Sequence, residues 1–243
     1  MSNTRHTHLI PGESAIYRVA RDKLFQAELD LIEQVERVAA MRRVLPPGGE
    51  LKEDYVFEEG PADLRETRAV HPVRLSELFA PDKNTLILIN TMFAPDDDVP
   101  CPSCNCLADG YNATAQHLSD RVNFALVTRA PIRKLRFWAA TRGWNDIRLL
   151  SSFNNAFNAD YHTEMDAERQ MPSITIFVKG EDGIIRHFYS VETQFGPSEG
   201  RDPRHLDLYW PLWQLLDLTP EGRGTQWYPG YSYNSSIDSE CCS

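Results

Sequence analysis

Apolar residues along the chain occur both in short continuous runs and at helical spacing, which predicts alternating strands and helices. Two runs, Thr85 to Phe93 and Val122 to Thr128, are continuously apolar or β-branched, as is typical of strands buried in a parallel sheet. A helix is predicted to start at Pro131 and to continue to about Trp144, and Ile147 to Ser151 is predicted as a short additional strand. This alternation favours βαβ crossovers and a parallel core.

Later in the chain the pattern changes to strict alternation, which predicts an antiparallel hairpin. Ser173 to Val178 and Ile184 to Tyr189 alternate, and Asp182-Gly183 lies in the turn between them. An amphipathic stretch from Leu206 to Leu216, which Pro211 either starts or kinks, is expected to cover the sheet.

The first part of the chain is predicted to form one long helix between Glu13 and Pro46. Its apolar residues recur every three or four positions, at Leu24, Ala27, Leu31, Val35 and Val38. One apolar seam of this length suits either docking onto the main domain or pairing with a second copy in a homodimer. The general preference for burial within a chain favours docking.

These elements divide the chain into four predicted parts. They are a flexible lead (1–12), the helix with a connecting segment (13–84), the main domain (85–219) and a mobile tail rich in Gly, Ser, Tyr and Asn (220–243). Within the connecting segment, Lys52 to Phe57 is predicted as a short strand and Leu75 to Phe79 as a helical turn.

A C-x-x-C motif, Cys101-Pro102-Ser103-Cys104, lies between the first buried run and a predicted helix. Unpaired N–H groups and the helix dipole stabilise a thiolate at a helix N-terminus, which makes Cys101 the expected nucleophile. Pro102 suits the first helical position. On a helical wheel Cys104 falls on the apolar stripe, as a sheltered resolving thiol, while Cys106 points about 200° away from it.

Charged and polar neighbours of the motif allow more than one interpretation. Asp96, Asp97 and Asp98 would raise the pKa of Cys101 if they approach it; the alternatives are that they are solvated loop residues or that they select a basic partner. Asp109 and Tyr111 are candidates for a proton path, although capping and filling of the helix is the favoured role.

Composition narrows the classes of function. The chain has 243 residues and a formal net charge of -10, which argues against nucleic acid or an anionic membrane as the main partner. The start of the sequence has no apolar segment of signal-peptide length, and no stretch approaches a transmembrane span. We therefore expect a cytoplasmic protein, in which closely spaced cysteines are redox-active or bind metal.

The metal alternative rests on Cys101, Cys104 and Cys106, with His117 on the same helix, and soft thiolates would favour copper(I), zinc or an iron–sulfur cluster. Cys106 faces away from the other two cysteines, which argues against a shared metal. We therefore expect the protein to work without a cofactor. The adjacent Cys241 and Cys242 are candidates to pass electrons to the internal dithiol or to hand over a soft metal, or have no role.

The order of strand, C-x-x-C helix, strand, helix, proline-initiated hairpin and final helix resembles the thioredoxin fold, an α/β fold with a central mixed sheet flanked by helices. That resemblance implies a cis bond at Met171-Pro172, with these residues, Pro102 and Ser103 shaping a substrate groove that faces Cys101. Peroxiredoxins carry a Thr three residues before the attacking Cys and a Pro four before that. Here those positions are Asp98 and Ala94, so a peroxidase is disfavoured.

A closer resemblance covers most of the chain, from about Glu13 to Gly222. Five segments in order are similar to the thioredoxin-like domain of unknown function 899 family: residues 17–24, 41–49, 54–57, 101–104 with 108–112, and 128–135. We therefore predict a thiol–disulfide oxidoreductase that acts on a protein or small-molecule disulfide and depends on a reducing system. The alternative is a non-catalytic or metal-binding module of the same fold.

Overall fold

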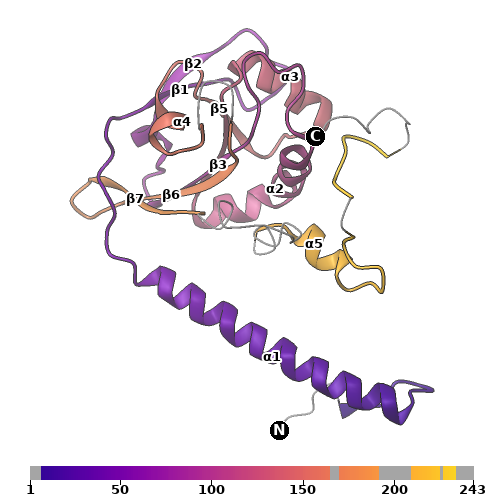
Figure 1. Ribbon diagram of the computed structural model, residues 1–243. Helices are drawn as coiled ribbons and strands as arrows, with labels where there is room; N and C mark the ends of the chain where they lie inside the picture. The colour runs from indigo at the N-terminus through magenta and orange to yellow at the C-terminus, as the bar shows by residue number, and fades with distance from the viewer. Residues whose placement is uncertain (1–6, 165–169, 192–208, 225–226, 234–243) are drawn as a thin grey trace. The chain divides into compact units, whose positions relative to one another are not determined.

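The computed structural model describes residues 7–164, 170–191, 209–224 and 227–233 (Figure 1). The chain divides into two compact units, Met1–Pro46 and Pro47–Ser243. None of the helices in the described ranges is both long and apolar enough to cross a membrane.

The first unit contains the predicted long helix, α1 (Ala15–Arg43). Ser14 caps it, because its side-chain oxygen accepts a hydrogen bond from the backbone N–H of Tyr17 at 3.1 Å. The helix ends ahead of Pro46 and Pro47, which cannot continue it. The long N-terminal helix is thus confirmed, and the partner of its apolar seam stays a prediction.

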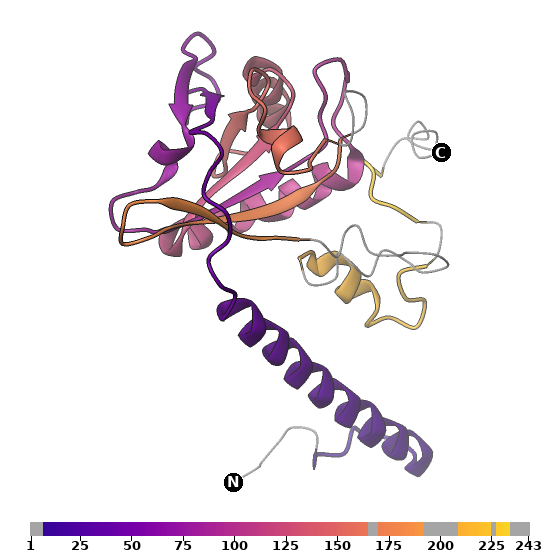
Figure 2. The same ribbon diagram turned by 60° about the vertical axis from the view of Figure 1, so that its left-hand side comes forward.

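The second unit is built on a seven-stranded mixed sheet with the order β2-β1-β5-β4-β3-β6-β7. The strands in chain order are β1 (Val56–Glu59), β2 (His71–Arg74), β3 (Thr85–Asn90), β4 (Asn123–Thr128), β5 (Arg148–Ser151), β6 (Ser173–Lys179) and β7 (Ile185–Ser190). The central strands β3, β4 and β5 are parallel, and β6 pairs antiparallel with the other side of β3. The hairpin of β6 and β7 forms one edge of the sheet (Figure 2).

Helices cover the two faces of the sheet and bury two hydrophobic clusters. One face is covered by α2 (Pro102–Arg121) and α3 (Ile132–Arg142) (Figure 1). Their apolar residues, such as Ala115 and Leu135, share a buried cluster with Ile89 and Leu126 of the sheet. On the other face, the 3₁₀ turn η2 (Leu75–Leu78) and the short α4 (Phe157–Asp160) surround Leu88. The strongly apolar central strands are therefore enclosed on both sides, as their continuous pattern predicted.

Two short elements differ from the prediction. The first strand lies at Val56–Glu59 rather than at Lys52 to Phe57, and β2, which contains Pro72, was not predicted. β2 is the edge strand, and β1 lies between β2 and β5. Strands of four residues are too short to show a clear periodicity, and the proline in β2 is tolerated because that strand lies at the edge of the sheet.

The last helix, α5 (Pro211–Leu216), starts at Pro211, so the proline initiates the helix. Of the stretch that was expected to cover the sheet, Leu206 to Leu208 lie outside the described residues, and Tyr209 packs against the cluster on the sheet. Trp210 and Trp213 pack with Leu107 of α2. The helix therefore extends the apolar surroundings of α2.

Candidate active site: a dithiol at the start of α2

Cys101 occupies the N-cap of α2, directly after the loop that follows β3. The loop holds it in place through its backbone, since the Cys101 N–H donates to the Met92 carbonyl at 3.0 Å. Its own carbonyl accepts the first helical bond, from the Asn105 N–H at 2.9 Å. Pro102 fills the first helical position, so the predicted strand, loop, C-x-x-C and helix are all present.

The two thiols of the motif differ in exposure. Cys104 is 5% exposed, while Cys101 is half-buried, which is the difference that the helical wheel predicted. Cys106 points elsewhere and packs at the edge of the cluster formed by Leu107, Trp210 and Trp213. Only Cys101 of the motif pair is therefore accessible to a substrate.

Hydrogen bonds favour ionisation of Cys101. The Cys104 thiol donates a hydrogen bond to the Cys101 sulfur, and the backbone N–H groups of Cys104 and Ser103 also stabilise its charged form. Together they lower the pKa of Cys101 to about 6, although burial acts in the opposite direction. The same bond to Cys101, together with burial, raises the pKa of Cys104. The Met92 N–H, which lies against the Cys104 sulfur, lowers that pKa but by less. The pKa of Cys101 is thus lowered and that of Cys104 raised, which favours Cys101 as the nucleophile.

This difference in pKa predicts the pH dependence of alkylation. A thiol with a lowered pKa is already ionised at neutral pH, so the iodoacetamide reaction of Cys101 should have its midpoint near pH 6. Cys106, whose pKa burial raises to about 11, serves as the comparison on the same helix. Mass spectrometry of labelled peptides across pH 4 to 10 should follow Cys101 through its midpoint, while Cys106 stays largely unlabelled. A Cys101 midpoint near that of an ordinary thiol, about 8.5, would contradict the predicted ionisation.

The acidic loop does approach the thiolate. Asp97 raises the pKa of Cys101 through its negative charge, although less than the hydrogen bonds lower it. The Asp97 carboxylate accepts the Ala94 N–H at 2.6 Å and is thereby held in the loop. Lys134 of α3 contacts the same loop. Its Nζ donates to the Pro95 carbonyl at 2.9 Å and lies 5.2 Å from the centroid of the Phe93 ring.

The segment before β6 lies beside this loop, as the fold resemblance implied. The Asn90 side chain donates to the Met171 carbonyl at 3.4 Å, and the Phe93 N–H donates to the Gln170 side chain at 3.1 Å. The predicted cis bond at Met171-Pro172 is wrong, however, because no cis peptide bond occurs in the described residues. The trans form is the intrinsically preferred one for an X-Pro bond, and the dipeptide itself carried no signal for cis. A substrate groove formed by Met171, Pro172, Pro102 and Ser103 stays a prediction.

Asp109 and Tyr111 have structural partners. The Asp109 carboxylate accepts the indole N–H of Trp144 at 2.7 Å and forms an ion pair with Arg142 at 2.5 Å. The Tyr111 hydroxyl donates to the Tyr209 carbonyl at 2.8 Å. These contacts join α2 to α3 and to the segment before α5, in line with the favoured capping and packing role.

Sequence reasoning missed a group of residues that surrounds the site from distant parts of the chain. The Tyr231 hydroxyl donates to the Pro100 carbonyl, and its ring makes an edge contact with Trp138, with 5.5 Å between ring centroids. The Trp138 indole donates to the Asn105 side chain at 2.8 Å. Tyr231 belongs to the tail that was predicted to be mobile, and the mobility of that tail stays a prediction. Tyr231 lies 131 positions from Pro100, and nothing in its Gly- and Ser-rich surroundings marks it.

The alternative metal set is not assembled. Within the described ranges, no group of three or more His, Cys, Asp or Glu side chains is placed to hold a metal ion, so Cys101, Cys104 and Cys106 do not converge. Cys101, Cys104 and Cys106 are all free thiols. Cys241 and Cys242 lie outside the described residues.

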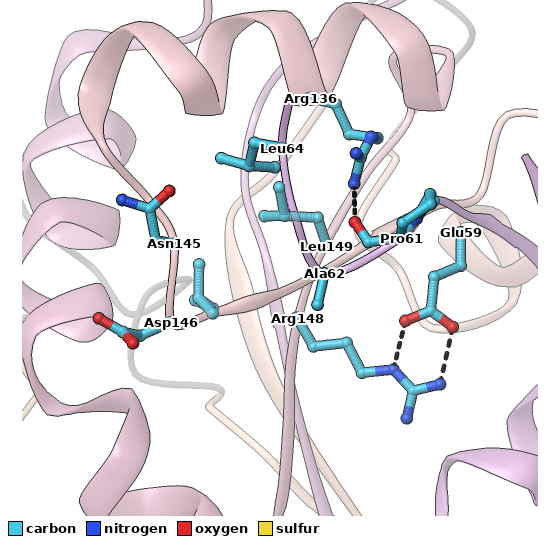
Figure 3. Close-up of a pocket in the computed structure, with 11 residues that line it drawn as sticks. Glu59, Pro61, Ala62, Leu64, Arg136, Asn145, Asp146, Arg148 and Leu149 are labelled. Carbon is cyan, nitrogen blue, oxygen red and sulfur yellow. Dashed lines mark hydrogen bonds and ion pairs between the residues drawn. The ribbon is translucent and has the colours of Figure 1, made fainter. Parts of the chain in front are cut away.

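A cavity of about 300 Å³ lies among β1, β5 and α3 (Figure 3), and its lining includes no cysteine. Its charged side chains are already paired: Arg148 forms a two-point ion pair with Glu59 at 2.6 and 2.8 Å. Arg136 donates to the carbonyls of Pro61, Asp63 and Glu66. These pairs anchor the connecting segment, so the cavity has a structural explanation.

A parallel β3–β4–β5 core, an antiparallel hairpin on the far side of β3 and a C-x-x-C at the start of the helix after β3 define a thioredoxin-like protein. The chain belongs to the family described as bacterial protein of unknown function (DUF899), whose profile matches residues 6–238. No curated protein matches the chain.

Similar solved structures are peroxiredoxins. Peroxidoxin BcpB from Mycobacterium tuberculosis is 20% identical with a TM-score of 0.42, and the match covers 68% of this chain and 94% of that one. AhpC from Enterococcus faecalis is 13% identical with a TM-score of 0.45 over 71% and 94% of the two chains. Reduced Prx3 from Vibrio vulnificus, in complex with H2O2, is 18% identical with a TM-score of 0.44 over 60% and 84%.

Proposed function

We propose that this protein is a thiol–disulfide oxidoreductase in which Cys101 attacks and Cys104 resolves. The observation that carries the proposal is the position of Cys101 at the N-cap of α2, half-buried and three residues before the buried Cys104. An accessible cysteine at a helix N-terminus with a sheltered second thiol suits disulfide exchange, and the lowered pKa of Cys101 favours its thiolate form.

The reaction proceeds in two exchange steps. The Cys101 thiolate attacks one sulfur of a substrate disulfide, forms a mixed disulfide and releases the other substrate sulfur as a thiolate. Cys104 then loses its proton and attacks the Cys101 sulfur, which closes the Cys101–Cys104 disulfide and releases the reduced substrate. An external dithiol of a reducing cytoplasm returns both cysteines to the thiol form. The substrate class is a protein or small-molecule disulfide.

A redox titration tests this function. The full-length protein is equilibrated in glutathione or dithiothreitol buffers of graded potential, and free thiols are counted by a mass-shifting maleimide, with metal content determined on the same sample. We expect one two-electron transition that joins Cys101 to Cys104 and no stoichiometric metal. Bound metal that blocks labelling of the pair, or cysteines that never join, would instead support a binding module.

A further inference from the structure

A cavity of about 430 Å³ lies beside the β6–β7 hairpin. Its lining includes Ser173 at the start of β6, together with His187 and Ser190 of β7. Tyr161 and His162, which follow α4, also line it. No cysteine of the described residues is part of this lining, so the cavity is separate from the dithiol.

A β-bulge brings His187 and Ser190 to the same face of β7. Along a regular strand, residues three positions apart point to opposite faces. Here the pairing of β6 with β7 shifts register between Ile176 and Phe177, so that Phe188 is an extra residue of β7. Bulges of this kind re-aim side chains and are frequent beside active sites.

The two re-aimed side chains are in hydrogen-bond contact. His187 Nε2 lies 2.9 Å from the Ser190 hydroxyl oxygen, which also lies 3.3 Å from the Thr175 hydroxyl. The Tyr161 ring stacks on the imidazole with 6.0 Å between centroids, and the Phe177 ring meets the imidazole edge-on at 6.1 Å. A serine within about 3 Å of a base that other groups hold in place is the arrangement of an activated nucleophile.

The backbone around this pair is constrained at two points. The His187 N–H donates to the Gly49 carbonyl at 2.9 Å, and the His187 carbonyl approaches Gly48 so closely that no side chain fits at position 48. Of the non-glycine residues that the structure describes, only His162 has a positive φ, at 55°. Strained residues of this kind are concentrated at functional sites.

The acidic groups at the cavity already have cationic partners. Asp160 pairs with Lys52 at 2.6 Å, and Glu50 pairs with Arg186 at 3.2 Å. The charges of both carboxylates are thus largely neutralised, and the other polar side chains of the lining are imidazoles and hydroxyls. Such a lining suits a neutral polar substrate, for example an ester.

We propose that Ser190 is a nucleophile activated by His187 and that this cavity takes a small carboxylic ester as its substrate. The Ser190 oxygen attacks the ester carbonyl carbon while His187 Nε2 takes up the hydroxyl proton. The carbon–oxygen bond to the leaving alcohol then breaks, and the alcohol receives that proton from His187. Water attacks the acyl-serine and gives a proton to His187, which returns it to Ser190 as the carboxylic acid leaves.

A serine-directed reagent tests the nucleophile in the full chain. Diisopropyl fluorophosphate forms a phosphorus–oxygen bond with an activated serine and releases fluoride. Trypsin cuts after Arg186 and Arg201, so the modified serine appears in peptide 187–201, and fragmentation of that peptide locates the label. We expect Ser190 of the folded protein to be labelled at least about a hundredfold faster than in the urea-unfolded chain, where His187 no longer acts as its base.

Matched variants assign the roles, with the fold of each checked by urea unfolding. His187→Gln should slow labelling of Ser190 by about a hundredfold, and His117→Gln, which removes an exposed imidazole from α2, should leave it unchanged. Hydrolysis of p-nitrophenyl acetate is followed in a Cys101→Ser background, so that the Cys101 thiolate does not contribute. Ser190→Ala should abolish this turnover, whereas Ser190→Cys keeps a nucleophile beside His187 and should still be acetylated.

Each outcome supports or overturns a part of the proposal. Labelling of Ser190 that is no faster in the folded than in the unfolded chain, or ester turnover that survives in Ser190→Ala, would overturn it. An unchanged labelling rate in His187→Gln would overturn the role of His187 as the base. The Cys101–Cys104 redox transition should be unaffected by Ser190→Ala, so the esterase and the oxidoreductase are tested separately.

Discussion

Cys101→Ser is expected to abolish catalysed disulfide exchange, with a loss of roughly a thousandfold or more in the rate with a fluorogenic disulfide peptide. A serine hydroxyl is not ionised at neutral pH and cannot form a disulfide, so both the nucleophile and the covalent intermediate disappear. Steady-state turnover with dithiothreitol as the reductant measures the effect.

Two other variants on the same helix complete this experiment. Cys104→Ser should still attack the substrate but fail to resolve, so that a mixed disulfide with Cys101 accumulates and is visible as a mass increase. Cys106→Ser removes a thiol whose pKa is raised by burial and should leave turnover unchanged. Turnover by Cys101→Ser at a rate close to that of the wild type would rule out Cys101 as the nucleophile.

Phe157→Ala should produce the largest loss of stability. The Phe157 side chain is 1% exposed and lies in a cluster of aromatic rings with centroids 4.9 to 6.2 Å away, those of Tyr55, Phe57, Tyr161 and Phe177. Removing a buried phenylalanine costs about 3–5 kcal/mol, because the apolar contacts are lost and a cavity remains.

Urea unfolding followed by fluorescence measures this loss as a lower midpoint with an unchanged slope. Phe137→Ala is the matched control, since Phe137 is 74% exposed on α3 and the same substitution there should change the free energy of unfolding by less than about 0.5 kcal/mol. Equal losses in the free energy of unfolding would show that the buried Phe157 contributes no more to stability than the exposed Phe137.

The central elements were predictable because each has a strong local cause. The continuous apolar run from Thr85 gave β3, and Pro102 together with the apolar stripe through Leu107 gave α2 and the unequal exposure of its two thiols. The Asp182-Gly183 turn, with Gly183 at φ 77°, gave the β6–β7 hairpin. In these segments the local pattern and the tertiary environment favour the same conformation.

Other features depend on contacts between residues far apart in the sequence. The strand β1 is stabilised by pairing with β2 and β5, and α5 by the apolar side of α2, so neither position follows from local spacing. The attachment of Tyr231 to Pro100 is of the same kind. The cis bond at Met171-Pro172 was expected from the fold resemblance alone, and the residues themselves offered no independent support.

Met92 connects the two thiols through main-chain atoms: its carbonyl accepts the Cys101 N–H, and its N–H lies against the Cys104 sulfur. The chemistry of its side chain plays no part in either contact. Position 92 should therefore accept many replacements without disturbing the dithiol, with proline excluded because it lacks the N–H. A comparison of related sequences that looks for invariant side chains would overlook this position, although it supports both sulfurs of the site.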